Sequence, residues 1–194
     1  LRVARFAARF AHLGFTVAPE TLELMREISK MGELEHLVAE RVWQELHKML
    51  VTQSPQVGLQ VLRSAAALAV ILPELEALYG VPQPAKYHPE IDTGIHTMMV
   101  LEQAVKLSES PVVRFAALVH DLGKAATPAH LWPQHTRHEK LGADLINAMS
   151  ARLRIPNDCR DLGVIVSLHH TRCHRAMTHL APDLYTTLEL TDAL

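Results

Sequence analysis

Apolar residues recur at intervals of three and four along nearly the whole chain, and this spacing restricts the fold more than any other feature of the sequence. The first segment is typical: one helical face carries Val3, Phe6, Ala7 and Phe10, and Gly14 follows as a stop signal. Alternating runs of β-branched residues between turn residues, the usual signal for strands, are scarce. The sequence therefore predicts an all-α protein.

Start and stop signals divide this pattern into separate helices. We expect helices over residues 1–13, 19–31, 39–50, 55–69 and a short one from 73, then 94–107, 111–120, 138–153, 156–174 and 181–194. The stretch 81–89 holds three prolines, which fix φ and disfavour helix in the residue before them. We therefore expect a helical neck and body over 1–80, a connector over 81–92 and a second helical domain over 93–194.

The composition excludes several classes of protein. A net charge of -2 gives no general attraction to nucleic acid or to membranes, so a polyanion would need a local basic patch. The two cysteines, Cys159 and Cys173, fit a reducing cytoplasm, and no run reaches the length of a membrane span. We expect a cytoplasmic protein without a membrane partner, either a monomer or a homo-oligomer. The chain opens in helix-like sequence without Met, which suggests a fragment.

Histidine is the unusual residue, because ten of the 13 lie at or after His88. Imidazole binds borderline metals and transfers protons near neutral pH. One of these histidines, in the pair His120-Asp121, ends an apolar helical run where a core needs neither side chain. We expect Gly123 to end the helix and let both side chains turn toward one cation.

Two distant residues could complete this site. His96 begins the helix that precedes the His120 helix, and a hairpin of the two would place His96 opposite His120. Asp192 interrupts an apolar run, where a buried carboxylate needs a partner. Two imidazoles and two carboxylates suit manganese, iron, cobalt, nickel or zinc better than calcium.

Other candidates remain open between a function and a plain structural role. His138 and His170 are either further ligands or ordinary helix residues. Lys124 could bind a phosphate oxygen or simply favour a helix C-terminus. Arg2 and Arg5, on one helical face with Arg9, could face phosphates or solvent.

An open nitrogen and oxygen site beside a lysine favours the hydrolysis of a phosphate ester. We expect the catalytic side chains to be His120, Asp121, Lys124 and His138. Other chemistries lack their motifs, because the sequence has no G-x-S-x-G elbow, P-loop, G-x-G-x-x-G or H-E-x-x-H.

The order His96, His120-Asp121, Asp192 resembles the HD superfamily of metal-dependent phosphohydrolases. Within it, the segments 88–97 and 114–124, with Trp132, Pro133 and His138, look like the HD domain of bacterial CCA-adding tRNA nucleotidyltransferases. The segments 1–15 and 39–46 are similar to the helical neck of the same family. The resemblance covers essentially the whole chain.

This resemblance implies a set of residue roles. Arg2 and Arg5 match arginines of the family's ATP and CTP pocket, and the body helps to hold the 3' end of tRNA. A divalent metal, with nickel favoured for the phosphatase, would bind His96, His120, Asp121 and Asp192, with His138 and His170 as second-metal or outer positions. The implied activities are 2',3'-cyclic phosphodiesterase, 2'-nucleotidase and phosphatase, so the expected substrates are 2',3'-cyclic and 2'-phosphate nucleotides.

The sequence lacks the family's catalytic head, with the carboxylates that hold magnesium and a nucleoside triphosphate. We therefore expect no nucleotidyl transfer from this chain alone. Two alternatives stay open: a non-catalytic tRNA-binding module with a vestigial HD site, and a free-standing HD nucleotidase or alarmone hydrolase.

Overall fold

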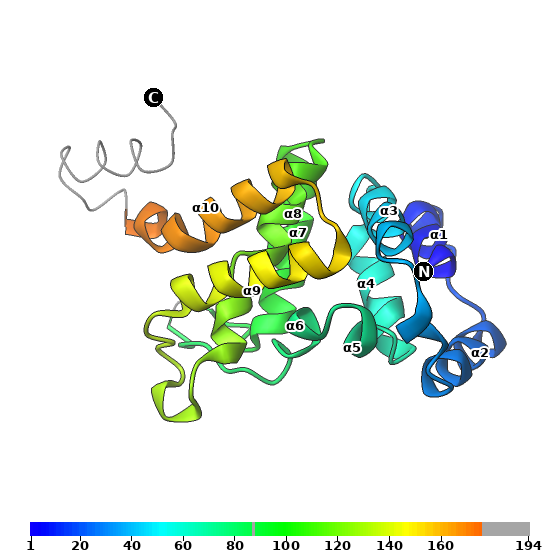
Figure 1. Cartoon of the computed structure of the whole chain (residues 1–194), viewed down its shortest axis with the longest axis horizontal. Helices are drawn as coiled ribbons and strands as arrows, with labels where there is room; N and C mark the ends of the chain where they lie inside the picture. Colours follow the sequence, from blue (N-terminus) through cyan, green and yellow to red (C-terminus); the bar gives the residue numbers. More distant parts are fainter. Residues whose placement is uncertain (87, 176–194) are drawn as a thin grey trace.

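The computed structural model describes residues 1–86 and 88–175, and these residues form a helical protein (Figure 1). The first half contains α1 (Arg2–Phe10), η1 (Ala11–Leu13), α2 (Pro19–Lys30), η2 (Glu33–His36), α3 (Ala39–Leu50), α4 (Pro55–Ser64), α5 (Leu68–Ile71) and α6 (Pro73–Glu76). The second contains α7 (Thr93–Leu107), α8 (Pro111–Val119), η3 (Leu122–Ala126), η4 (Ala129–Leu131), α9 (His138–Leu153) and α10 (Asn157–Arg175). The prediction of an all-α fold is confirmed.

Most expected helices appear within a residue or two of their predicted bounds, but the helix expected over 55–69 is wrong. It divides into α4 and α5, because Ala66 adopts a left-handed conformation with φ of 55°. The amide of Ala67 donates to the carbonyl of Leu62 at 2.9 Å, which closes α4 with a Schellman turn. Glycine usually occupies such a turn, so the alanine at position 66 did not indicate that the helix would end there. The helix expected over 181–194 lies outside the described residues.

The connector does not separate two cores. One continuous apolar cluster includes Trp43 and Leu46 of α3 together with Phe115 and Leu118 of α8, and the rings of Trp43 and Phe115 meet edge to face at 5.6 Å. Within the connector, Pro82 and Asp92 form an isolated antiparallel bridge, and the described residues contain no sheet. The boundaries at 80 and 93 remain a prediction.

The second half positions the candidate site. Helix α7 packs against α8, while α10 packs against both α8 and α9 (Figure 1). Asp92 caps α7 by accepting a hydrogen bond from the amide of Ile95 at 2.9 Å. None of the helices in residues 1–86 and 88–175 is both long and apolar enough to cross a bilayer.

Candidate metal centre

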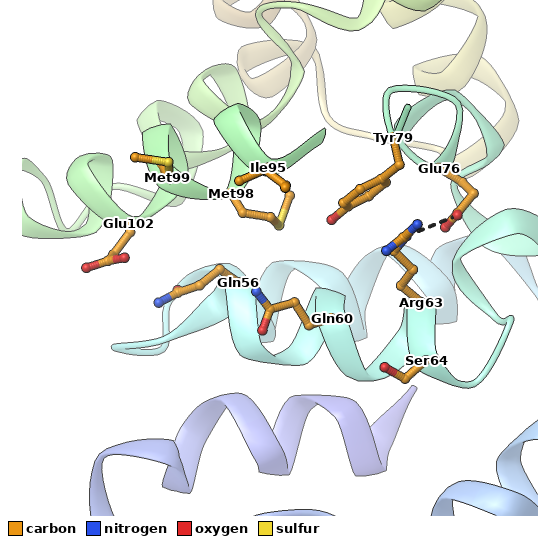
Figure 2. A pocket seen from close by; sticks show the side chains of 10 residues that line it. All are labelled: Gln56, Gln60, Arg63, Ser64, Glu76, Tyr79, Ile95, Met98, Met99 and Glu102. Carbon is orange, nitrogen blue, oxygen red and sulfur yellow. Dashed lines mark hydrogen bonds and ion pairs between the residues drawn. The ribbon is translucent and has the colours of Figure 1, made fainter. Parts of the chain in front are cut away.

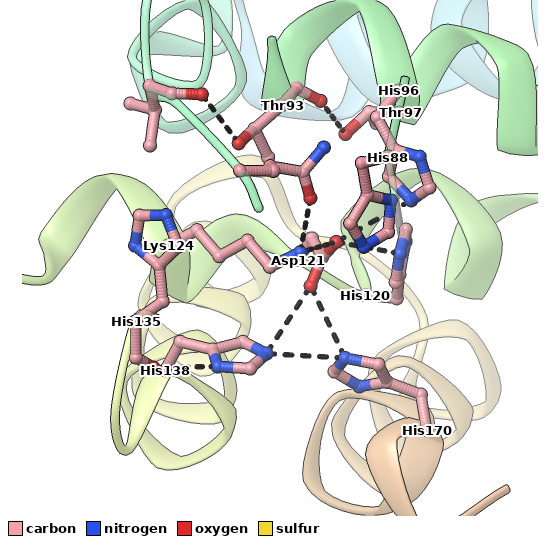
Figure 3. A network of polar contacts seen from close by, with 12 residues as sticks. His88, Thr93, His96, Thr97, His120, Asp121, Lys124, His135, His138 and His170 are labelled. Carbon is pink, nitrogen blue, oxygen red and sulfur yellow. Dashed lines mark hydrogen bonds and ion pairs between the residues drawn. The ribbon is translucent and has the colours of Figure 1, made fainter. Parts of the chain in front are cut away.

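His120 and Asp121 lie just beyond the last residue of α8, where the chain passes into η3. Both side chains are buried, and only 1% of the surface of Asp121 is exposed to solvent. The carboxylate is surrounded by imidazole rings that come from four different segments of the chain (Figure 3).

Gly123 does not end the helix through a left-handed conformation, so that part of the sequence prediction is wrong. Helix α8 already ends at Val119, and Gly123 lies within η3. A side chain at Gly123 would collide with the backbone of α9, at the carbonyl oxygen of His138 and the amide nitrogen of Gly142. The glycine is therefore needed for close approach, which brings the start of α9 against Asp121.

The two oxygens of Asp121 face different pairs of histidines. Its Oδ2 lies 3.0 Å from Nε2 of His120 and 3.8 Å from Nε2 of His96. Its Oδ1 lies 3.4 Å from Nε2 of His138 and 3.3 Å from Nε2 of His170. The hairpin of α7 and α8 does place His96 opposite His120, with ring centroids 5.7 Å apart. The carboxylate is thus shared between two groups of potential ligands.

The outward contacts of the four rings determine where their lone pairs point. Each Nδ1 faces an acceptor: a backbone carbonyl for His120, His138 and His170, at 2.8, 2.9 and 3.0 Å, and the Glu90 carboxylate for His96, at 2.6 Å. Because these oxygens can only accept, each Nδ1 carries the proton and each neutral ring presents a lone pair at Nε2. Four lone pairs therefore point toward the Asp121 carboxylate.

Such an arrangement needs positive charge inside the cluster. The Nε2 atoms of His138 and His170 lie only 3.3 Å apart, where two lone pairs repel each other. Oδ1 of Asp121 is buried and accepts no hydrogen bond from any described residue. Divalent metals prefer this set of imidazole and carboxylate donors, so the residues present fit a metal.

Lys124 supplies one positive charge at the edge of the cluster. Its ammonium donates to Oδ2 of Asp121 at 2.7 Å and to the side-chain oxygen of Gln83. Lys124 is itself buried, so in this structure the ammonium holds the carboxylate rather than pointing to solvent. It fixes one Asp121 oxygen and leaves the other for a cation.

Burial and neighbouring charges shift two acid–base groups of the centre. Burial raises the pKa of Asp121, but protonation of the surrounding imidazoles, His120 foremost, outweighs burial and holds this pKa well below its usual value. Burial and the nearby His120 lower the pKa of His96 to about 4, against the opposing effects of Asp121 and Glu90. At neutral pH Asp121 is therefore ionised and His96 is neutral, the forms that bind metals.

Three side chains around these ligands were not predicted from the sequence. Glu90 lies between His96 and His88, with its Oε1 3.3 Å from Nδ1 of His88. Gln83 binds Lys124, and the buried His135 ring contacts the carbonyl oxygen of Pro82 at 2.7 Å. These three residues come from loops, where no periodic pattern indicates which side chains turn inward.

Three predicted site residues remain. Asp192 lies outside the described residues. Arg2 and Arg5 lie on α1 in the first half of the chain. Arg2 is exposed, whereas Arg5 is half-buried and pairs with Glu45 at 2.7 Å.

Two family models match the sequence. A model described as "Probable RNA and SrmB- binding site of polymerase A" matches residues 14–79. The HD domain model matches residues 93–191, about half of the chain, and includes every histidine of the cluster around Asp121.

Whole-sequence comparison finds similar proteins in several bacteria. The multifunctional CCA protein of Psychromonas ingrahamii is 60% identical over 193 residues, which cover 100% of this chain and 47% of that protein. The protein of the same name in Vibrio cholerae is 60% identical over 176 residues, or 91% and 44% of the two chains. The one in Pseudomonas fluorescens is 54% identical over 192 residues, or 99% and 47%. This chain therefore spans less than half the length of the curated relatives it matches.

Proposed function

Since this chain belongs to the HD domain family and matches the neck and HD portion of multifunctional CCA proteins, we propose that it carries the metal-dependent phosphohydrolase of a CCA-adding tRNA nucleotidyltransferase. The observation that carries this proposal is the convergence of four imidazole Nε2 atoms on one buried carboxylate. Such a site has no use in a core and suits a cation that activates water.

His96, His120 and Asp121 would hold the metal, with Asp192 as a further proposed ligand. His138 and His170 would bind a second ion through the other Asp121 oxygen or assist as outer groups. A divalent metal bound there would lower the pKa of a coordinated water and polarise a phosphoryl oxygen.

The protein's own side chains would orient these ligands and the substrate. Lys124 holds Asp121, and the Nδ1 contacts fix each imidazole in the tautomer that leaves Nε2 available. A phosphoester entering the centre would meet the Lys124 ammonium, and His138 once it has gained a proton, as groups that steady its negative charge. His138 has its Nδ1 proton committed to a backbone carbonyl, so its Nε2 is the atom that could accept a proton.

We further propose the substrate and metal that the family resemblance implies. The substrates would be 2',3'-cyclic and 2'-phosphate nucleotides or the 3' end of tRNA, and nickel or another transition metal would support hydrolysis. Arg2 and Arg5 would contact ATP or CTP in an intact enzyme, with magnesium bound by a separate catalytic head. A cytoplasmic location agrees with these substrates.

Metal analysis and an ester screen test the centre together. Purified protein should contain a transition metal in roughly stoichiometric amount and hydrolyse 2',3'-cAMP. The substitution His120→Ala should abolish both, whereas His130→Ala, which alters an exposed histidine, should change neither. Persistent hydrolysis by His120→Ala protein of normal fold would refute the assignment.

A second function, RNA binding without catalysis, is favoured by the RNA-binding model that matches residues 14–79. It predicts that Arg2→Ala weakens tRNA binding while Arg172→Ala, another exposed arginine, does not. It also predicts that the purified protein contains no metal, and this result separates it from the hydrolase.

A further inference from the structure

The connector over residues 81–92 leads from a cavity to the candidate metal centre. Tyr79, just before it, lies in the wall of a cavity of about 590 Å³ between α4 and α7, with its ring centroid 3.7 Å from the Arg63 guanidinium (Figure 2). Gln83, within the connector, is buried, and its side-chain oxygen accepts a hydrogen bond from the Lys124 ammonium. The groups that hold the connector therefore also determine where Lys124 lies.

The ring of His135 holds this part of the connector. His135 is only 1% exposed, and its Nε2 lies 2.7 Å from the backbone carbonyl oxygen of Pro82, the residue before Gln83. A carbonyl oxygen can only accept, so Nε2 carries the proton and donates it. The other ring nitrogen, Nδ1, lies 2.7 Å from the hydroxyl of Thr127, the residue that follows η3. His135 therefore ties the connector to the segment that carries Lys124.

The position of this proton separates His135 from the candidate metal ligands. The four rings around Asp121 carry their protons at Nδ1 and present Nε2 to the carboxylate. His135 has the opposite tautomer, and its Nε2 is committed to a backbone carbonyl. It is thus a buried histidine beside the centre that holds no metal itself, and its role needs another explanation.

The backbone of His135 reaches a different part of the centre. Its carbonyl oxygen accepts hydrogen bonds from the amide of His138 at 3.0 Å and from Nδ1 of the same residue at 2.9 Å. His135 also adopts a left-handed conformation with φ of 53°, which is unfavourable for a residue with a side chain. Such a conformation in a buried residue next to a candidate site indicates that the surrounding contacts require it.

We propose that His135 is a positioning residue, which holds Lys124 on one oxygen of Asp121 and His138 on the other (Figure 3). Lys124 donates to Oδ2 at 2.7 Å, whereas Nε2 of His138 lies 3.4 Å from Oδ1. The ring of His135 acts on Lys124 through the connector, and its backbone carbonyl acts on His138 directly. This inference rests on the proposed function of the centre as a metal site, and it explains how one carboxylate keeps an oxygen free for a cation.

Two substitutions of His135 separate positioning from a purely structural role. Asparagine tolerates the left-handed conformation well, but its side chain is too short to reach the carbonyl of Pro82. Glutamine reaches about as far as Nε2 of histidine and keeps a donor, but it favours the left-handed conformation less. If His135 served only the backbone conformation, His135→Asn would bind metal better than His135→Gln. Positioning through the ring predicts the reverse order.

Calorimetric titration of the metal-stripped protein with nickel makes this comparison, and urea unfolding measures the stability of each variant. We expect His135→Asn to bind nickel about tenfold more weakly than the unaltered protein, and His135→Gln to remain within about threefold of it. His130→Asn changes an exposed histidine of the neighbouring η4 and should leave the affinity unchanged. Unchanged affinity in His135→Asn, or tighter binding by His135→Asn than by His135→Gln, would overturn the proposal.

Gln83→Leu tests the same chain of contacts without altering the left-handed residue. It removes the acceptor that holds the Lys124 ammonium beside Asp121, so nickel binding should again weaken about tenfold. In the double variant with His135→Asn, the two losses should not add, because both act through the same lysine. Full affinity in folded Gln83→Leu protein would show that the connector does not position Lys124.

Nitrogen NMR of the histidine rings in metal-free protein provides a readout that needs neither metal nor activity. The proton should lie at Nε2 in His135 and at Nδ1 in His138. In His135→Asn protein the His138 ring should become a mixture of tautomers, because the carbonyl that fixes it is no longer tied to the connector. A proton at Nδ1 of His135 would overturn the inference, whatever the activity of the protein. Nickel binding without hydrolysis of 2',3'-cAMP would instead refute the hydrolase and leave the inference intact.

Discussion

The Glu90 carboxylate faces Nδ1 of His96, whereas backbone carbonyls face Nδ1 of His120, His138 and His170 at hydrogen-bonding distance. Its Oε1 accepts a hydrogen bond from Nδ1 of His96 at 2.6 Å, which fixes both the orientation and the tautomer of the ring. A negative acceptor also makes the imidazole a stronger metal ligand than a backbone carbonyl does. Glu90 is therefore a positioning residue, which acts on the metal through His96.

We predict that Glu90→Gln lowers metal affinity about tenfold without unfolding the protein. Glutamine keeps an acceptor of similar size but removes the charge that orients and polarises His96. Competition with a metal-binding dye measures the affinity, and circular dichroism monitors the fold. Glu35→Gln alters an exposed glutamate far from the centre in sequence and serves as the control. Unchanged affinity in the Glu90 variant would show that His96 is not a ligand.

The two cysteines should differ sharply in reactivity. Burial, together with the nearby Asp158, raises the pKa of the Cys159 thiol to about 11. At pH 8 only about one thiol in a thousand is then ionised, and the thiolate is the reactive form. Cys173 is exposed. Iodoacetamide at pH 8 should therefore label Cys173 alone in the native protein and both cysteines in urea, as read by mass spectrometry. Labelling that survives Cys173→Ser in the native state would contradict this prediction.

At the level of the elements, the centre depends on how closely η3 approaches α9. Gly123 and Gly142 lie in contact at this crossing, where a side chain at Gly123 would meet the backbone of α9 and one at Gly142 would meet the Ser167 hydroxyl. The sequence did not indicate this crossing, because Gly123 was expected to end a helix. Both glycines keep His138 within reach of Asp121.

We predict that Gly123→Ala destabilises the protein by about 3 kcal/mol and abolishes metal binding, because the methyl group would collide with the backbone of α9. Gly163→Ala is the matched control. Its nearest neighbours are side-chain atoms of Val119, Phe115 and Ile146, at 3.1 to 3.5 Å, which can adjust. Urea unfolding and metal titration measure the two effects. An equal loss of stability in both variants would show that the crossing of η3 and α9 is not specially tight.

Helix periodicity predicted most of the helices and the pairing of His96 with His120, because both follow from local spacing and a short connection. It could not predict the end of α4 at Ala66, because alanine is not a usual helix stop signal. Ala66 nevertheless adopts φ of 55° there. Nor could it identify Glu90 or Gln83, because both lie in loops, where the side chains that turn inward follow no regular spacing. The sequence offered His138 and His170 only as open candidates, because they lie 32 positions apart and meet only through the packing of α9 against α10.

At the scale of the whole molecule, Arg114 joins the two halves of the chain. Its buried guanidinium donates from Nη1 to the carbonyls of Leu50 and Thr52, at 2.7 and 2.9 Å, and from Nε to that of Ser108 at 2.8 Å. The first two acceptors lie at the end of α3, in the half that the sequence assigned to a separate domain. A residue of α8 thus satisfies backbone groups on the far side of the expected boundary.

Because the apolar core is also continuous from α3 to α8, we predict that residues 1–80 and 93–194 unfold together. Thermal unfolding by calorimetry should show one transition, with the calorimetric enthalpy equal to the van't Hoff enthalpy. Arg114→Leu should lower the free energy of unfolding by about 3 kcal/mol, since it removes the guanidinium that donates to four carbonyls. The transition should move to lower temperature and remain single.

Arg137→Leu provides the control, because Arg137 is exposed before α9 and far from the end of α3 along the chain. Two transitions in the unaltered protein, with only one shifted by Arg114→Leu, would mean that the halves fold independently.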